Sequence, residues 1–146
     1  DTSSAASDVY KRQVTGPITA KIYASSSAPD TDFYVILVDV YPDGHTQYLT
    51  QGQLRARYRN GMESPQLLNA GEIVELDIVI QSTSNVLQKG HRLRIEITSS
   101  DYSRHARNQN VEDEEGVTAN TAVAHNKIHH TEVHQSYIML PIIPTQ

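Results

Sequence analysis

The sequence predicts an all-β fold, a two-sheet antiparallel sandwich with jelly-roll topology. Three observations lead to this fold class. Many segments alternate apolar and polar residues with the two-residue period of a half-buried strand. Turn-forming Gly, Pro, Asp and Asn residues separate these segments at short intervals. No segment has the period of an amphipathic helix of normal length, so we expect about seven to nine short strands.

The first strand is expected after Pro17, in the segment PITAKIYAS, where apolar residues occupy every second position. After the turn-rich loop SSSAPDT, the segment DFYVILVDVY is apolar almost throughout. Such a run is typical of a central strand that is covered on both faces. The order Pro42-Asp43-Gly44 suits a turn, because proline fixes φ and glycine accepts positive φ. The chain should therefore return as a hairpin over residues 45–50.

The segment QLRARYRNG, residues 53–61, is expected to form a separate strand. Its apolar residues alternate with arginines, so one face can pack while the guanidinium groups point outward. These arginines, with those near residue 93, could form an anion-binding face. We favour cross-strand pairing with acidic residues, in which each exposed pair contributes roughly 0–1 kcal/mol. The arginines are Arg55, Arg57, Arg59, Arg92 and Arg94, and the acidic residues are Glu75, Asp77 and Glu96.

The second half of the chain predicts further strands around one long loop. Residues 99–120 are polar and contain the acidic run Glu112 to Glu115, which is typical of a surface loop. Pro141 and Pro144 should stop strand pairing near the C-terminal end. The remaining strands are expected at residues 74–80, 92–97, 127–133 and 136–140.

Residues 1–13 are left out of the fold prediction. The stretch SSAASDVYKRQ lacks the apolar region of a secretory signal. Read backwards into codons, it matches a common transposase-type sequencing adapter translated in frame. We therefore interpret residues 1–13 as an adapter-derived or disordered tail with little structure, and residues 14–146 as the jelly-roll domain of a polypeptide truncated before Val14. A flexible natural linker is the alternative.

Composition limits the classes of function. The 146 residues fit one domain, because a chain of this size buries roughly 68–70% of its unfolded surface. A net charge of −5 argues against nucleic acid as a partner. The absence of cysteine excludes a disulfide scaffold and a thiolate metal site, and leaves the cellular compartment open. No run approaches the roughly 18 apolar residues that span a bilayer, so no membrane partner is expected.

The sequence offers no catalytic motif. The G-x-S-x-G turn of a nucleophile elbow does not occur, and neither does the β/α alternation that supports it. Ser25, Ser26 and Ser27 precede a proline in a loop, where serines usually form turns. We therefore expect no catalytic residue and no cofactor.

Histidines gather near the C-terminal end of the chain. On a strand, His130 and His134 would share one face, as would His125 and His129, and Glu132 could complete a zinc site. However, two-residue periodicity does not define a tetrahedral site, and a third well-placed ligand is missing. We favour surface or interface roles and assign no metal site.

Aromatic residues suggest a different class of function. Glycan-binding modules use exposed aromatic rings as stacking platforms, and this chain has eight Tyr, one Phe and no Trp. Tyr23, Tyr48 and Tyr102 fall where a ring could be exposed, although tyrosines also line the rims of sandwich cores. A free-standing β-sandwich module that binds a glycan or a peptide is therefore the alternative function.

Four strings point to one family. In chain order they are VTGPITAKIYASSSAPDTDFYVILVDVYPDG, QGQLRARYRNG, SNVLQKGHRLRIEITSSDYSRHARNQN and HTEVHQSYIMLPIIP. Together they resemble the C-terminal domain of CocE/NonD-type hydrolases, a family that includes X-Pro dipeptidyl-peptidases, cocaine-esterase-like acyl esterases and α-amino-acid ester hydrolases. The resemblance covers essentially all of residues 14–144.

The resemblance implies a non-catalytic jelly roll that follows an α/β-hydrolase domain with a Ser-His-Asp triad. No position here matches that triad, which lies upstream in the family. The resemblance also implies that the partners of this domain are the hydrolase and cap domains of the same polypeptide. An ester or peptide substrate is expected only for the full-length polypeptide, and the sequence does not distinguish an esterase from a peptidase. The acidic stretch VEDEEGVTAN departs from the Gly- and Asn-rich connection usual in relatives. Just before it, Tyr102, Arg104, Arg107 and Asn108 are the candidate interdomain contact.

Overall fold

The computed structural model describes residues 2–4, 12–113 and 117–144 of the chain. In these residues the regular secondary structure is strand apart from one short 3-10 helix, so the all-β prediction is confirmed. No helix in this part of the chain is long and apolar enough to cross a membrane. The elements are β1 (Thr2–Ser4), β2 (Arg12–Ser26), β3 (Asp32–Val40), β4 (Thr46–Arg55), η1 (Ala56–Tyr58), β5 (Val74–Leu87), β6 (Arg92–Thr98), β7 (Asn126–Ile128), β8 (Tyr137–Met139) and β9 (Ile142–Ile143).

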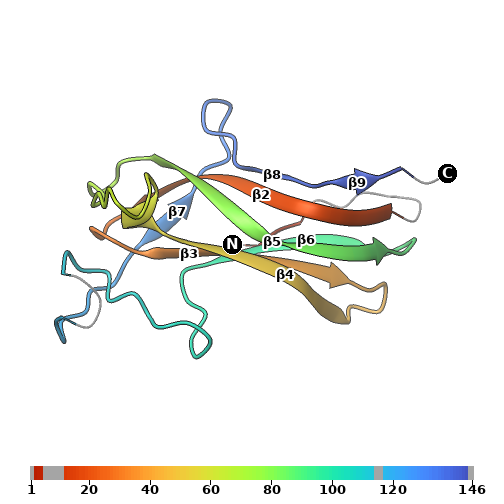
Figure 1. Cartoon of the computed structure of the whole chain (residues 1–146), viewed down its shortest axis with the longest axis horizontal. Coiled ribbons are helices and arrows are strands. Elements are labelled where there is room, and N and C mark those ends of the chain that lie inside the picture. The colour runs from red at the N-terminus through yellow and green to blue at the C-terminus, as the bar shows by residue number, and fades with distance from the viewer. Residues whose placement is uncertain (1, 5–11, 114–116, 145–146) are drawn as a thin grey trace.

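The strands form one curled antiparallel sheet rather than two separate ones. Its order is β1-β6-β3-β4-β5-β2-β7, and β8 and β9 also pair with β2. One half holds β2 and β5 with the C-terminal strands, and the other holds β3, β4 and β6 (Figure 1). A single paired position, Gly52 with Ile80, joins β4 to β5. The described residues therefore show two facing halves of one hydrogen-bonded sheet, which is consistent with a sandwich, and not the two separate sheets that were predicted.

The core lies between these halves. Alternate residues of β2 and β5 pack against alternate residues of β3, and all of them are almost fully buried. The central position predicted for β3 is confirmed, because eight of its nine residues are buried and β4 and β6 flank it. The inward residues are Ile18, Ala20, Ile22, Ala24, Phe33, Val35, Leu37, Leu76, Ile78 and Ile80.

Gly52 lies where the sheet folds back on itself. A Cβ atom at this position would come within 2.5 Å of the Val79 carbonyl oxygen and 2.9 Å of the Ile80 Cα. Both are backbone atoms, which cannot move aside as the end of a flexible side chain can. Glycine is therefore required here by the close approach of two strands.

The region after the first hairpin differs from its prediction. The turn at Pro42–Gly44 is confirmed, with the Gly44 amide donating to the Tyr41 carbonyl. However, the two strands expected at 45–50 and 53–61 are one strand, β4, which ends at Arg55. The chain then enters η1, so the alternation of arginines continues past the end of the strand.

Both ends of the chain also differ from expectation. At the C-terminal end, β7 and β8 are shorter than predicted, and β9 pairs with β2 beyond Pro141, where pairing was expected to stop. In the N-terminal segment, residues 2–4 pair with β6 and residues 12–13 belong to β2, although little structure was expected there. Residues 5–11 of that segment lie outside the described residues.

We predict that Gly52→Ala destabilises the domain by about 1–3 kcal/mol, because the added methyl group overpacks the contact between β4 and β5. Urea unfolding followed by circular dichroism measures the change. The matched control is Gln53→Ala, which introduces the same residue at the next, exposed position and should change stability by no more than about 0.5 kcal/mol. Equal stability of the two variants would contradict the role assigned to Gly52.

Candidate functional site

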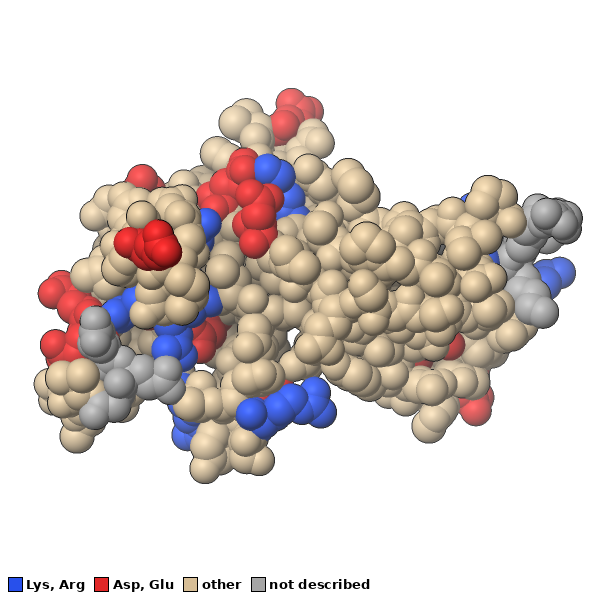
Figure 2. Space-filling view, viewed as in Figure 1, with Lys and Arg blue, Asp and Glu red and all other residues tan. Residues whose placement is uncertain are grey.

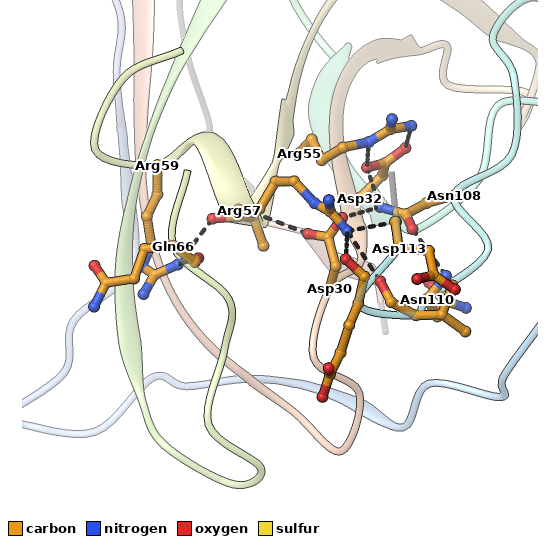
Figure 3. Close-up of polar contacts among 12 residues, drawn as sticks. Asp30, Asp32, Arg55, Arg57, Arg59, Gln66, Asn108, Asn110 and Asp113 are labelled. Atoms are coloured by element: carbon orange, nitrogen blue, oxygen red, sulfur yellow. Dashed lines mark hydrogen bonds and ion pairs between the residues drawn. The ribbon is translucent and has the colours of Figure 1, made fainter. Parts of the chain in front are cut away.

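A polar network joins the start of β3 to the loop over residues 101–113 (Figure 3). Its carboxylates are Asp30 and Asp32, from the turn before β3 and from its first residue. Its cations are Arg55, the last residue of β4, and Arg57 in η1. The network lies at the end of the molecule where β4 gives way to η1. Charged side chains gather toward this end in Figure 2, whereas the opposite half of that face is largely uncharged.

Asp30 and Arg57 form a buried ion pair at the centre of the network. The Arg57 Nε donates to Asp30 Oδ2 at 2.8 Å, and the Arg57 amide donates to Asp30 Oδ1 at 2.9 Å. The side chains are only 8% and 1% exposed. Burying two charges is costly, but here the opposite charge and the extra hydrogen bonds offset the lost hydration. The pair fixes η1 against the turn before β3.

The Arg57 side chain also holds the acidic loop, by binding backbone carbonyl groups of the loop. The Arg57 Nη2 donates to the carbonyl oxygens of residues 111, 112 and 113, at 2.9, 3.2 and 3.0 Å. Of the acidic run, residues 114 and 115 lie outside the described residues. One guanidinium group therefore ties the 101–113 loop to the buried Asp30.

A second ion pair and an asparagine complete the network. Arg55 binds Asp32 through two parallel hydrogen bonds of 2.8 and 3.0 Å. The Asn108 Nδ2 donates to Asp30 Oδ2 at 2.9 Å and to Asp32 Oδ1 at 2.8 Å. Its Oδ1 accepts the Asn110 amide, and Asn110 has the left-handed φ of 60° that asparagine tolerates well. Asn108 thus bridges both carboxylates and shapes the local turn.

The four residues expected at an interdomain contact divide into two groups. Tyr102 is 66% exposed, and the Arg107 guanidinium lies over its ring at 4.2 Å from the centroid. Arg104 is exposed, lies 5.6 Å from the Tyr48 ring centroid and donates to Gln51 Oε1. Asn108, by contrast, is turned inward to the two carboxylates. Three of the four therefore face outward from the loop, and the fourth anchors it.

Hollows lie along the contact between this loop and the sheet. One, of about 390 Å³, is lined by Asp30, Arg55, Arg57, Tyr58, Met62, Asn108, Gln109 and Asp113. Another, of about 290 Å³, lies beside Tyr48, Val79 and Arg104. The Tyr48 and Tyr102 rings, considered above as glycan platforms, each have an arginine over the ring. Each arginine therefore lies over one face of its ring.

The C-terminal histidines are placed apart from this network. His129 Nε2 lies 2.9 Å from the Ser25 Oγ, and its ring is 6.4 Å from that of His134. Ser25 is 6% exposed, and within the described residues no carboxylate contacts His129 to orient it as a base. No group of three or more metal-ligating side chains occurs in the described part of the chain.

The pairing predicted for the arginines is only partly right. Arg94 contacts Glu96, a predicted partner, but along its own strand, whereas Glu75 and Asp77 bind Lys21. Arg55 and Arg57 turn toward the carboxylates before β3 because the strand ends at Arg55 and η1 redirects the chain. Sequence reasoning missed both carboxylates, since Asp30 was taken as part of a turn-rich loop and Asp32 as the first residue of a strand. Two carboxylates at the start of a largely apolar strand were the available signal.

Asp101 stabilises the start of the same loop. Its carboxylate accepts a hydrogen bond of 3.0 Å from the Gln51 amide and lies 2.9 Å from His105 Nδ1. The Gln51 hydrogen bond, followed by the His105 contact, holds the pKa of Asp101 below its ordinary value of 3.8. The ionised form is therefore favoured by the folded loop.

We predict that replacing Arg57 by methionine destabilises the domain by about 3–5 kcal/mol, since Asp30 would keep a buried, unpaired charge. Urea unfolding measures the loss, and hydrogen exchange should show faster exchange in residues 108–113. The control is Arg92→Met, at an exposed position of β6, where we expect a change of about 0.5 kcal/mol or less. Unchanged exchange in the loop of the Arg57 variant would contradict the anchoring role.

We predict a pH dependence that comes from Asp101. Folding lowers the pKa of Asp101. Its contribution to the free energy of unfolding is therefore present above the pKa of the unfolded state, 3.8, and is lost as the pH falls through the pKa of the folded state. As the pH is lowered through that window, the midpoint of thermal unfolding should fall more steeply for the unchanged chain than for Asp101→Asn. Glu63→Gln, at an exposed position, should keep the steep dependence. Parallel curves for all three proteins would rule out this role of Asp101.

Known proteins share both the sequence and the fold. A cocaine esterase from Rhodococcus sp. (strain MB1 Bresler) is 44% identical over 136 residues, which cover 90% of this chain and 23% of that protein. The structure of an α-amino acid ester hydrolase matches with a TM-score of 0.87 at 23% identity, over 97% of this chain and 25% of that one. An aminopeptidase from a marine sediment Thaumarchaeota archaeon matches with a TM-score of 0.85 at 24% identity, over 98% of this chain and 25% of that one. The chain thus spans about a quarter of the length of each relative.

A family model gives the same assignment. It is described as the X-Pro dipeptidyl-peptidase C-terminal non-catalytic domain and matches residues 11–139. Together with the esterase relative, it confirms the resemblance to the C-terminal domain of CocE/NonD-type hydrolases. The chain belongs to the family of X-Pro dipeptidyl-peptidase C-terminal non-catalytic domains.

Proposed function

We propose that this domain packs on the α/β-hydrolase and cap domains of a serine hydrolase, within one polypeptide, and helps to shape the substrate pocket. The chemistry on an ester or peptide bond belongs to the hydrolase domain. The observation that carries the proposal is the outward-facing group of Tyr102, Arg104 and Arg107 on a loop whose base is fastened to a buried ion pair.

The anchoring of the loop supports a docking role. An exposed loop normally loses conformational entropy on binding, and this cost weakens the interaction. Here Arg57 and Asn108 hold the loop in the free domain, through contacts with Asp30 and with backbone carbonyls. The side chains that point outward are therefore presented in a fixed arrangement before a partner arrives.

The chemistry of the exposed group indicates the kind of surface that it fits. Tyrosine and arginine are enriched among the residues that carry most of the binding energy at protein interfaces. With Arg107 stacked on Tyr102, the pair offers a flat apolar area edged by positive charge, and Arg104 adds a second cation beside Tyr48. We infer that the facing surface of the hydrolase or cap domain is acidic at its rim.

A chimera tests this function. Residues 14–144 of this chain replace the matching part of the Rhodococcus cocaine esterase, and hydrolysis of 4-nitrophenyl acetate is measured. We expect an active chimera, and we expect the isolated chain to show no hydrolysis above buffer. In the chimera, the triple variant Tyr102→Ala, Arg104→Ala and Arg107→Ala should shorten the half-life of activity at elevated temperature at least several-fold, since loss of interface anchors costs more than about 1 kcal/mol each.

Two comparisons separate docking from simple loss of stability. The same triple variant in the isolated chain should keep its unfolding midpoint, because the three side chains are exposed there. A control chimera with Lys89→Ala and Arg92→Ala removes two exposed cations at the turn between β5 and β6 and should keep its half-life. If the triple variant behaves like this control, the 101–113 loop is not the docking surface.

A further inference from the structure

The connection that follows η1 carries the only Asn-Gly pair of the sequence, Asn60-Gly61. Residues 60–67 are all exposed, so water reaches the pair directly. Gly61 has a φ of +108°, and a Cβ atom built there would meet no atom of the described residues within 4 Å. The side chain of this asparagine and the backbone that follows it therefore lie in open surroundings at the surface.

An asparagine followed by glycine reacts readily with its own backbone. The Gly61 amide nitrogen attacks the Asn60 side-chain carbon Cγ, the side-chain NH2 group leaves as ammonia with the proton of the attacking nitrogen, and a five-membered succinimide ring closes. Water then opens the ring at one of its two carbonyl carbons, which gives aspartate or isoaspartate at position 60. Glycine favours the attack because it has no Cβ atom to hinder a close approach of the backbone.

Two hydrogen bonds hold the reacting groups apart in the closed loop. The Gly61 amide donates to the Tyr58 carbonyl oxygen at 2.9 Å, and the Asn60 Nδ2 donates to Gln66 Oε1 at 2.7 Å. Both bonds lie in an exposed turn outside the sheet, so a local opening breaks them without unfolding the core. The opening of this turn therefore sets the rate at which the folded chain reacts.

We propose that Asn60 is a site of spontaneous deamidation, at which the folded domain accumulates aspartate and isoaspartate. This inference is independent of the proposed function, because it involves only water and the chain itself. Every other asparagine precedes a residue with a side chain, in the pairs Asn69-Ala70, Asn85-Val86, Asn108-Gln109, Asn110-Val111, Asn120-Thr121 and Asn126-Lys127.

The reaction matters to the fold because this connection ties η1 to the turn before β3. The Gln66 amide donates to the Arg57 carbonyl oxygen at 2.8 Å, and the Leu68 amide donates to the Pro29 carbonyl oxygen at 2.7 Å. Either product removes the amide donor that binds the Gln66 side chain and adds a negative charge. Isoaspartate also inserts one extra carbon atom into the main chain. The modified turn should therefore hold the backbone of Arg57 less firmly.

Peptide mapping by mass spectrometry tests the site after the folded chain has been incubated at mildly alkaline pH. We expect the peptide with residue 60 to exchange an NH2 for an OH group in mass and to separate into two species. A protein L-isoaspartate methyltransferase should methylate one of them. The matched control is Asn69 in the same sample, an exposed asparagine whose Nδ2 donates to Glu72 Oε2 and whose next residue is alanine. Equal modification of Asn60 and Asn69 would overturn the proposal.

A variant tests what restrains the reaction. Gln66→Ala removes the acceptor that holds the Asn60 side chain, so the folded variant should deamidate several-fold faster, while Asn69 keeps its rate. In urea the variant and the unchanged chain should react equally fast, because the restraint is then absent from both. A folded variant that reacts no faster would disprove the restraint. Modification of Asn60 in urea alone would show that the folded domain has no such site.

The modified fraction tests the structural consequence. Its extra negative charge allows separation by anion exchange, and its Gln66 and Leu68 amides should exchange hydrogen several-fold faster than those of the unmodified fraction. The amides of β2 and β3 are the control and should exchange at the same rate in both fractions. Equal exchange at residues 66 and 68 in the two fractions would contradict the link between Asn60 and the backbone of η1.

Discussion

The fold depends on the close crossing of β4 and β5 at Gly52 and Ile80, where one sheet turns back to face itself. Because a single hydrogen-bonded sheet supplies both layers, the inward residues of β2, β5 and β3 can meet in one core. The crossing leaves no room for a side chain. β4 ends at Arg55, three residues beyond it, where η1 begins and the polar network lies.

The central strand β3 carries a buried carboxylate near each end. At its start, Asp32 binds Arg55 and Asn108. Near its other end, Asp39 is 5% exposed, and both of its oxygens lie within 3.0 Å of His91 Nδ1. Apolar packing thus fixes the strands, while buried charges fix the connections on either side of them. Surface pairs such as Lys21 with Glu75 are more exposed and contribute less.

The sequence predicted the strands well wherever alternation persisted between clear turns. The segments of β3 and β6 lie close to where the pattern placed them, whereas β2 and β5 include the predicted segments and extend beyond them, and the buried run of β3 correctly indicated a central strand. The pattern failed at residues 53–61, because alternation alone does not show where a strand ends and a 3-10 turn begins. The same failure hid the site, since the partners of Arg55 and Arg57 are distant in sequence and depend on that turn. Only three-dimensional proximity reveals that Asp30, in a predicted loop, and Asp32, at the start of a predicted strand, belong to one network.

The way in which Arg57 holds the 101–113 loop affects how this loop can change in evolution. The guanidinium contacts the carbonyl oxygens of residues 111–113, which every amino acid possesses, and does not contact their side chains. Substitutions at these three positions can therefore accumulate without loosening the anchor, provided that the backbone keeps its path. The same property makes the loop a suitable place for engineered substitutions that retune the surface while the fold stays intact.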